Sequence, residues 1–340
     1  MDSMDNNVVL SIDDLHVKFS LRGDTLNVIR GISLDIHRGE SIAIVGESGS
    51  GKSVFTKTFL GMLDSNGRID SGHIYFRDKD KDGNENVVDL ATYATEKEWL
   101  TIRGKQIAMI MQDPMTSLNP LKTIGHQLEE TVLLHRDVSK EEAHKRAVEL
   151  LTDVGINDPE RRCKQYPHEF SGGQRQRIGI ARALAVEPEF IICDEPISAL
   201  DVSIQAQVIN MLEDLQRERG LTYLFIAHDL SMVKHISDRI GVMYLGKIVE
   251  LTDADELYSN PKHPYTQALL SAIPIPDPEV AKKNQRILLE GDVPSPINPP
   301  SGCRFRTRCQ YAMDICAAEE PVTRELSEGH YCACHLYNDK

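Results

Sequence analysis

The sequence lacks any long hydrophobic run. Although 41% of its 340 residues are hydrophobic, no stretch approaches the roughly 18 consecutive apolar residues that a membrane-spanning helix needs. The N-terminus, Met1 to Asn7, carries acids where a secretory signal has a basic region and an apolar core. We therefore expect a cytosolic protein, unless a partner holds it at a membrane.

Basic residues are also scarce. The chain has 38 Lys and Arg against 52 Asp and Glu, a formal net charge of −14. A protein that binds duplex nucleic acid needs a basic surface to neutralise phosphates. The charge balance therefore argues against nucleic acid as the main partner. The sequence also shows no internal repeat.

Cysteine is sparse until the tail. Of seven cysteines, Cys163 and Cys193 stand alone and read as packing residues. The other five crowd together near the end of the chain: Cys303, Cys309, Cys316, Cys332 and Cys334. In a reducing compartment such a cluster is more often a metal site than a disulfide framework. The spacing fits neither a zinc knuckle nor a ferredoxin run, so the residues alone indicate a metal site of unspecified kind.

A glycine-rich loop is the strongest positive feature. The residues Gly46 to Ser53 fit the spacing G-x-x-x-x-G-K-[ST], between an apolar run at 41–45 and a helical pattern from Val54 to Leu63. Lys52 would bridge the β- and γ-phosphates of a nucleotide, and the Ser53 hydroxyl would bind Mg²⁺. The candidate nucleotide-binding residues are Gly46, Glu47, Ser48, Gly49, Ser50, Gly51, Lys52 and Ser53. The loop predicts that the chain binds a nucleoside triphosphate.

Hydrophobic periodicity predicts an α/β fold with a mostly parallel sheet. Strands are expected at 8–13, 26–36, 41–45, 71–76, 106–111, 190–193 and 221–227, and a hairpin at 240–249 around Gly246. Helices are expected at 54–63, 124–134, 140–154 after an N-cap at Ser139, 174–185 and 202–219.

Three further features concern domain organisation. The runs 8–13 and 26–36 alternate apolar and polar residues, which indicates an antiparallel β subdomain. The polar loop 77–86 is expected as a solvated surface insertion, with calcium binding as the alternative. We place one domain at 1–258, with an inserted helical subdomain at about 113–170, and a C-terminal extension at 259–340.

Two carboxylates end the apolar strand 190–193. Downstream of a phosphate-binding loop, Asp194 can reach the Mg²⁺ shell and Glu195 can activate the water that attacks the γ-phosphate. The alternative, a solvated strand end, is disfavoured by this context. The pair predicts hydrolysis of the nucleotide.

An ordered set of motifs carries a family resemblance. Ser171-Gly-Gly-Gln174, with Phe170 at the usual leucine, matches the signature motif of ABC-transporter ATPases. Gln112 resembles the Q-loop glutamine, residues 198–201 resemble the D-loop, and His228 resembles the switch histidine. The resemblance covers residues 8–258 and implies a P-loop (RecA-like) ATPase that uses ATP and Mg²⁺.

The resemblance also implies roles for these residues. The signature residues Ser171, Gly172, Gly173 and Gln174 would complete the ATP site of an opposite subunit, and Asp201 of the D-loop would also bind the nucleotide. His228 would contact the γ-phosphate, and Gln112 would contact Mg²⁺ and the attacking water. Phe19 lies where the family stacks an aromatic ring on adenine, although a core role is the alternative.

The tail narrows the resemblance. Residues 260–266 and 291–303 are similar to the C-terminal extension of oligopeptide and dipeptide importer ATPases, part of which nickel importers share. In these relatives, residues matching Cys303, Cys309, Cys316 and Cys334 hold a four-iron four-sulfur cluster. Zinc is the alternative, because thiolates suit both metals. Cys332 has no counterpart in the family pattern.

Together these features predict the ATP-hydrolysing subunit of a peptide importer at the cytoplasmic face of the membrane. The implied partners are a second, non-identical ABC ATPase, two membrane-spanning permease subunits and an extracytoplasmic peptide-binding protein, with no nucleic acid. A nickel-importer ATPase is one alternative. Another is an ABC ATPase acting on ribosomes or DNA, but such chains usually have two ATPase halves or a long coiled-coil insertion.

Overall fold

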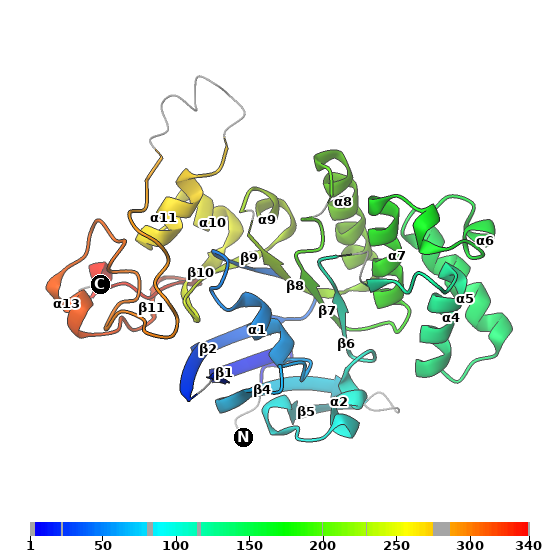
Figure 1. The fold of residues 1–340 in the computed structure, drawn as a ribbon, viewed down its shortest axis with the longest axis horizontal. Coiled ribbons are helices and arrows are strands. Elements are labelled where there is room, and N and C mark those ends of the chain that lie inside the picture. The colour runs from blue at the N-terminus through cyan, green and yellow to red at the C-terminus, as the bar shows by residue number, and fades with distance from the viewer. Residues whose placement is uncertain are drawn as a thin grey trace.

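Two β-sheets and several helices make up the chain (Figure 1). The computed structural model describes residues 4–21, 23–79, 84–113, 117–198, 200–228, 230–274 and 286–338. Among the helices in these ranges, none combines the length and the apolar character that crossing a bilayer requires.

The smaller sheet has the order β2-β1-β4-β5 and is antiparallel. Its strands are β1 (Val8–Leu21), β2 (Asp24–His37), β4 (Gly67–Lys79) and β5 (Glu85–Asp89). Alternate side chains such as Val17, Ile29 and Ile74 are fully buried beside Phe55 of helix α1 (Lys52–Thr58). The predicted antiparallel subdomain is confirmed.

The expected polar loop at 77–86 is shorter than predicted. Residues 77–79 of β4 pair with residues 85–87 of β5, because the ladder satisfies their backbone groups despite the polar composition. Residues 80–83 lie outside the described ranges.

The central sheet has the order β11-β12-β10-β9-β3-β8-β7-β6. Five neighbouring strands are parallel: β9 (Arg239–Tyr244), β3 (Ser41–Val45), β8 (Thr222–Ala227), β7 (Phe190–Asp194) and β6 (Ile107–Ile110). Every residue of β3 and β8 is buried, as expected for strands covered on both faces. The loops that follow β3, β6, β7 and β8 therefore share one edge of the sheet.

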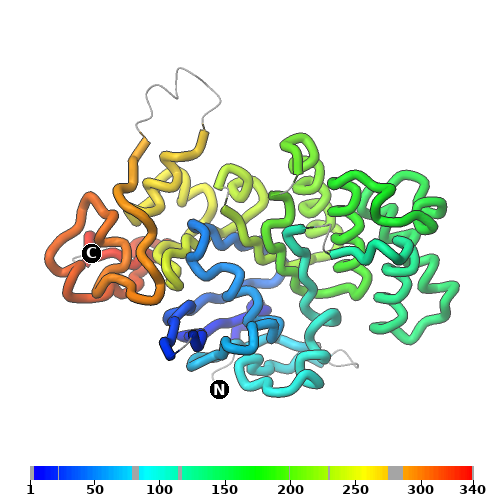
Figure 2. The backbone as a smooth tube through the Cα atoms, in the orientation of Figure 1, coloured from blue at the N-terminus to red at the C-terminus, as the bar shows by residue number. Residues whose placement is uncertain are grey.

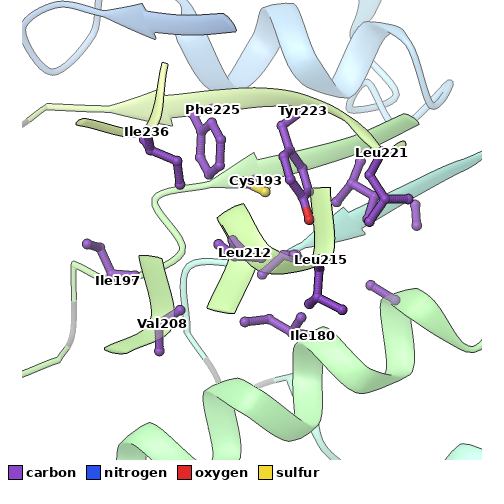
Figure 3. Packing of buried hydrophobic residues seen from close by; sticks show 14 of the residues in the cluster. Ile180, Cys193, Ile197, Val208, Leu212, Leu215, Leu221, Tyr223, Phe225 and Ile236 are labelled. Carbon is purple, nitrogen blue, oxygen red and sulfur yellow. The ribbon is translucent and has the colours of Figure 1, made fainter. Parts of the chain in front are cut away.

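Helices cover the central sheet, and their contacts form the larger core. Figure 3 shows Cys193 of β7 and Tyr223 of β8 facing Leu212 and Leu215 of α8 (Val202–Arg219), with Ile180 of α7 (Gly172–Leu184) below. Cys163 and Cys193 are both buried in this core, which confirms that they are packing residues.

Most predicted helices form close to their expected bounds. Helix α8 begins and ends as predicted and is capped by Gly220, whose φ is +65°. Helix α1 ends earlier than predicted because Gly61 takes φ +60° and the Met62 N–H closes back on the Lys57 carbonyl, a glycine-terminated cap.

The predicted helical subdomain contains α4 (Ile124–His135), α5 (Lys140–Asp153) and α6 (Pro159–Arg162), which lie at one end of the molecule (Figure 1). Ser139 caps α5 through a reciprocal pair with Glu142, as the sequence predicted. Residues 114–116 of this block are outside the described ranges.

The C-terminal segment lies at the opposite end (Figure 2). It includes α11 (Pro264–Ser271), α13 (Asp314–Ala318), β11 (Arg324–Ser327) and β12 (His330–Cys332). Strand β12 pairs with β10 (Lys247–Asp253), so the terminal hairpin extends the central sheet. The described residues also form the helices α2 (Glu96–Ile102), α9 (Leu230–Ile236) and α10 (Ala254–Ser259).

Candidate active site

The glycine-rich loop connects β3 to α1, as predicted. Gly46 has φ +153°, and a Cβ there would lie 2.2 Å from the Met243 carbonyl oxygen. Gly51 has φ +106° at the N-cap of α1. The first position has no room for a side chain and the second has a backbone that glycine favours, so both glycines are required by the shape of the loop.

Lys52 lies inside this loop and is only 6% exposed. Its ammonium donates to the Gly46 carbonyl at 2.7 Å and to the Glu47 carbonyl at 3.0 Å. Burial lowers the pKa of Lys52, while the charges of Glu195, Asp194 and Glu47 oppose that shift. A buried cation whose partners are carbonyl groups is suited to binding phosphate oxygens.

A cavity of about 590 Å³ opens beside the loop. It brings together eight of the predicted site residues: Ser48, Gly49, Gly51, Lys52, Ser53, Gln112, Glu195 and His228. A slightly larger cavity, of about 650 Å³, lies between the antiparallel sheet and β10, but none of the predicted site residues lines it. We therefore take the loop cavity as the candidate nucleotide site.

Glu195 lies at the centre of the polar groups in this cavity. It follows β7 with a left-handed φ of +45°. The Gln112 Nε2 donates to its Oε2 at 2.7 Å, and the His228 Nδ1 lies 3.3 Å from its Oε1. These side chains follow β7, β6 and β8, so the parallel sheet holds both oxygens of one carboxylate in place.

Asp194 is the last residue of β7, next to Glu195. Burial raises its pKa and so does the charge of Glu195, whereas Lys57 and Lys52 lower it. The two carboxylates and the two lysines thus form one charged group at the loop. Such a group can hold a divalent cation beside phosphates.

The remaining predicted residues do not line this cavity. Ser171 caps α7 through a reciprocal pair with Gln174, which places Gly172 and Gly173 in the first turn of that helix. Asp201 is the N-cap of α8. Phe19 is 9% exposed and packs over Gly67 in the antiparallel sheet, opposite Leu26. The roles predicted for these residues stay predictions.

Other residues line the cavity without having been predicted. They are Leu26, Asn27 and Val28 of β2, Val54, the turn at Leu245 and Gly246, and Pro296 of the C-terminal segment. The sequence predicted a hairpin turn at Gly246, and in the structure the Gly246 N–H donates to the Ser50 carbonyl at 2.8 Å. Nothing in the sequence predicted that the other residues line the cavity, because their position depends on packing between distant segments.

The tail cysteines share one neighbourhood. Burial, together with the charges of Cys303, Cys309 and Cys316, raises the pKa of Cys334 to about 11. Backbone N–H groups point at the sulfurs, including that of Leu336 toward Cys334. Within the described ranges, however, no three His, Cys, Asp or Glu side chains meet closely enough to hold a metal ion. Metal binding by the tail stays a prediction.

Comparison with known proteins decides the family. The family described as ABC transporter matches residues 29–198, half of the chain. The oligopeptide transport ATP-binding protein OppF of Escherichia coli is 48% identical over 337 residues, covering 96% of each chain. This chain belongs to the ABC transporter family.

Further similarities extend to the tail and the fold of this ABC ATPase. The family described as Oligopeptide/dipeptide transporter, C-terminal region, matches residues 249–316. The oligopeptide transport ATP-binding protein AppF of Bacillus subtilis is 46% identical and covers 99% of this chain and 100% of its own. A dimeric, ADP- and phosphate-bound structure of the ATP-binding cassette MJ0796 has a TM-score of 0.61 at 26% identity, covering 72% of this chain and 98% of that one. The predicted family and ABC ATPase fold are confirmed.

Proposed function

We propose that this ABC ATPase powers the import of oligopeptides or dipeptides across the cytoplasmic membrane as one subunit of a larger transporter. The observation that carries the proposal is the match of residues 249–316 to the oligopeptide/dipeptide C-terminal region. Relatives named for oligopeptide transport align along nearly the whole chain, which supports the same cargo class.

ATP is the nucleotide that the loop cavity holds in this proposal. Lys52 and the loop N–H groups bind its phosphates. Ser53, Gln112 and Asp194 offer the hydroxyl, amide and carboxylate oxygens that Mg²⁺ prefers, so these residues would hold the ion. When bound, Mg²⁺ neutralises phosphate charge and leaves the γ-phosphate open to attack.

Glu195 is the proposed general base. Its carboxylate is held by Gln112 on one oxygen and faces His228 on the other, so it is oriented before water arrives. The carboxylate accepts the proton of the attacking water, and His228 contacts the γ-phosphate.

A second ATPase subunit, non-identical to this chain, completes the site. The signature residues Ser171 to Gln174 begin α7 away from the chain's own cavity. A helix N-terminus presents N–H groups and positive dipole to phosphate, so these residues suit an ATP held by the partner subunit. Asp201, the N-cap of α8, would contact the nucleotide at the same interface between subunits. Closure of the two subunits around ATP would drive the transport cycle.

The remaining partners follow from the cargo. Two membrane-spanning permease subunits would form the path, and an extracytoplasmic peptide-binding protein would deliver the peptide. The helical subdomain at about 113–170 is the proposed docking surface for a permease. The ATPase would then lie at the cytoplasmic face of the membrane, held there by the permeases.

Uptake by the reconstituted transporter tests the cargo. Proteoliposomes containing the co-purified complex and its binding protein should accumulate labelled peptides of two to five residues only when MgATP is present on the ATPase side. A complex with Glu195→Gln should accumulate none, which controls for leakage. Uptake of Ni²⁺ without peptide uptake would replace this proposal with the nickel-importer alternative. Co-purification with ribosomes or DNA would reject transport itself.

We also propose that the tail cysteines hold a four-iron four-sulfur cluster through Cys303, Cys309, Cys316 and Cys334. The shared neighbourhood of these thiols supports it, as do the backbone N–H groups directed at the sulfurs of Cys303, Cys309 and Cys334. Cys332 is in strand β12, and of the other tail cysteines only Cys334 is among the charges that raise its pKa.

Zinc is the alternative, and it would require a tight arrangement of the same sulfurs. A Zn–S distance of about 2.3 Å in a tetrahedral site requires thiolates about 3.8 Å apart. No group of three potential ligands in the described part of the chain meets around a single ion. A four-iron cluster distributes its thiolates over four metal atoms, which suits a wider arrangement.

Replacement of Cys303 by Ser should remove iron and the visible absorbance of thiolate-bound iron from anaerobically purified protein. Its sulfur is one of the four proposed ligands, and serine is a poor substitute for a thiolate. The control, Cys332→Ser, should keep both signals. A colourless native protein that contains zinc would contradict the cluster assignment.

A further inference from the structure

The C-terminal segment reaches into the phosphate-binding loop through one ion pair. Arg308 Nη1 donates to Glu47 Oε2 at 2.7 Å, and its Nη2 donates to Glu47 Oε1 at 3.0 Å. The Arg308 side chain is 7% exposed and the Glu47 side chain 29%. A bidentate, largely buried ion pair of this kind fixes both the position and the orientation of the carboxylate.

A second contact holds the same loop residue by its backbone. The Glu47 N–H donates to the Tyr265 hydroxyl at 2.9 Å. Tyr265 is fully buried and packs against Tyr244 and Phe305, with ring centroids 4.7 and 5.4 Å away. Phe305 lies three residues before Arg308. This short segment therefore holds the Glu47 carboxylate directly, through Arg308, and the Glu47 N–H indirectly, through Phe305 packed on Tyr265.

A third contact is with the cavity itself. Pro296, from the same C-terminal segment, lines the cavity beside Lys52 and Ser53. The segment therefore contributes to the nucleotide site at two separate places. Gln112, Glu195 and His228 line the same cavity as Pro296.

The charge of Glu47 makes the ion pair important for the nucleotide. Burial lowers the pKa of Lys52, and Glu47 is one of three carboxylates whose charge opposes this, so its charge is felt at the phosphate-binding ammonium. An unpaired carboxylate in this loop would repel the triphosphate. Arg308 neutralises it where the loop must accept several negative charges.

We propose that Arg308 is a positioning residue of the ATP site, which holds Glu47 and cancels its charge so that the loop can bind ATP. The C-terminal segment is then a structural part of the nucleotide site as well as the mark of a transporter subfamily. The inference rests only on the ATP-binding part of the proposed function, and it is independent of cargo and of any metal in the tail.

Linkage gives the proposal a second consequence. If order in the C-terminal segment strengthens ATP binding, ATP binding must stabilise that segment by the same free energy. Amide hydrogens at residues 303–309 should therefore exchange more slowly when MgATP is bound. A segment that merely packed on the outside of the domain would not respond to the nucleotide.

The first test is a double-mutant cycle on the full-length chain, with MgATP affinity measured by calorimetric titration. Arg308→Gln should weaken binding about tenfold, because it leaves Glu47 unpaired beside the phosphates. Glu47→Gln should weaken it less, and Arg308→Gln combined with Glu47→Gln should match Glu47→Gln alone, because the repelling charge is gone. The control Arg306→Gln, whose side chain bonds Ser301, should bind as the native chain does.

The second test needs no variant. Hydrogen exchange of the native chain should show slower exchange at 303–309 with MgATP than without it. Three results would each overturn the proposal. Arg308→Gln could bind MgATP with native affinity, or the losses of affinity in the double variant could be additive. The exchange rates at 303–309 could also be the same with and without MgATP. A native chain that binds no MgATP would instead overturn the ATP site of the proposed function.

Discussion

The variant Glu195→Gln is expected to bind MgATP as tightly as the native chain but to hydrolyse it at least about 100-fold more slowly, since a positioned general base contributes about 10² to 10⁴ in rate. Glutamine fills the same space and still reaches Gln112 and His228, but its amide cannot accept a proton from water. The measurement is phosphate release by the assembled transporter, with affinity measured in parallel.

Glu187→Gln is a matched control for this variant. Glu187 also has a left-handed backbone, with φ +51°, but it pairs with Arg136 and Arg146 far from the cavity. It should therefore retain native turnover. Native turnover in Glu195→Gln would remove Glu195 from the role of general base and leave the water to another group.

A second large effect is expected for Lys52→Met. Methionine keeps the length of the side chain but removes the ammonium, which would bridge phosphate oxygens. A hydrogen bond to a charged group contributes about 1.5 to 3 kcal/mol, so MgATP affinity should fall about 10- to 100-fold. Calorimetric titration of the purified chain measures this directly.

The control for this variant is Lys57→Met. Lys57 lies one turn further along α1 and, like Lys52, lowers the pKa of Asp194, but it does not line the cavity. Its loss should change affinity by less than about threefold, as expected for a partly exposed charge that does not line the cavity. Equal losses of MgATP affinity in both variants would mean that the phosphates are bound by the overall positive charge near the loop and not by the position of Lys52 within it.

Local patterns predicted the centre of the site well. The strand 41–45, the loop at Gly46 and the carboxylates after 190–193 are each recognisable within a short window, because backbone sterics and burial act locally there. The same holds for α8, whose apolar spacing and closing glycine lie within one element. The family resemblance placed Gln112 and His228 in the same site as Glu195, and the shared edge of the parallel sheet explains how the three side chains meet.

Contacts between distant segments were not predictable. Glu47 and Arg308 are 261 residues apart, and nothing near either residue signals the other. Pro296 reaches the cavity because the C-terminal segment packs beside the loop. Strands β11 and β12 are short, and β12 pairs with β10 while β11 pairs with β12. The sequence position of Phe19 fits a role in stacking on adenine, whereas in the structure its ring is buried over Gly67.

The central claim is that this chain holds ATP in its own loop but hydrolyses it efficiently only with a second subunit. The direct measurement compares the steady-state ATPase rate per site of the isolated chain with that of the assembled transporter in lipid, at saturating MgATP. The isolated chain should bind MgATP but hydrolyse it about 100-fold more slowly, because the signature residues of the partner are missing. A loss of this size is usual when preorganised hydrogen-bond donors are absent. An isolated, monomeric chain that hydrolyses ATP as fast as the transporter would contradict the claim.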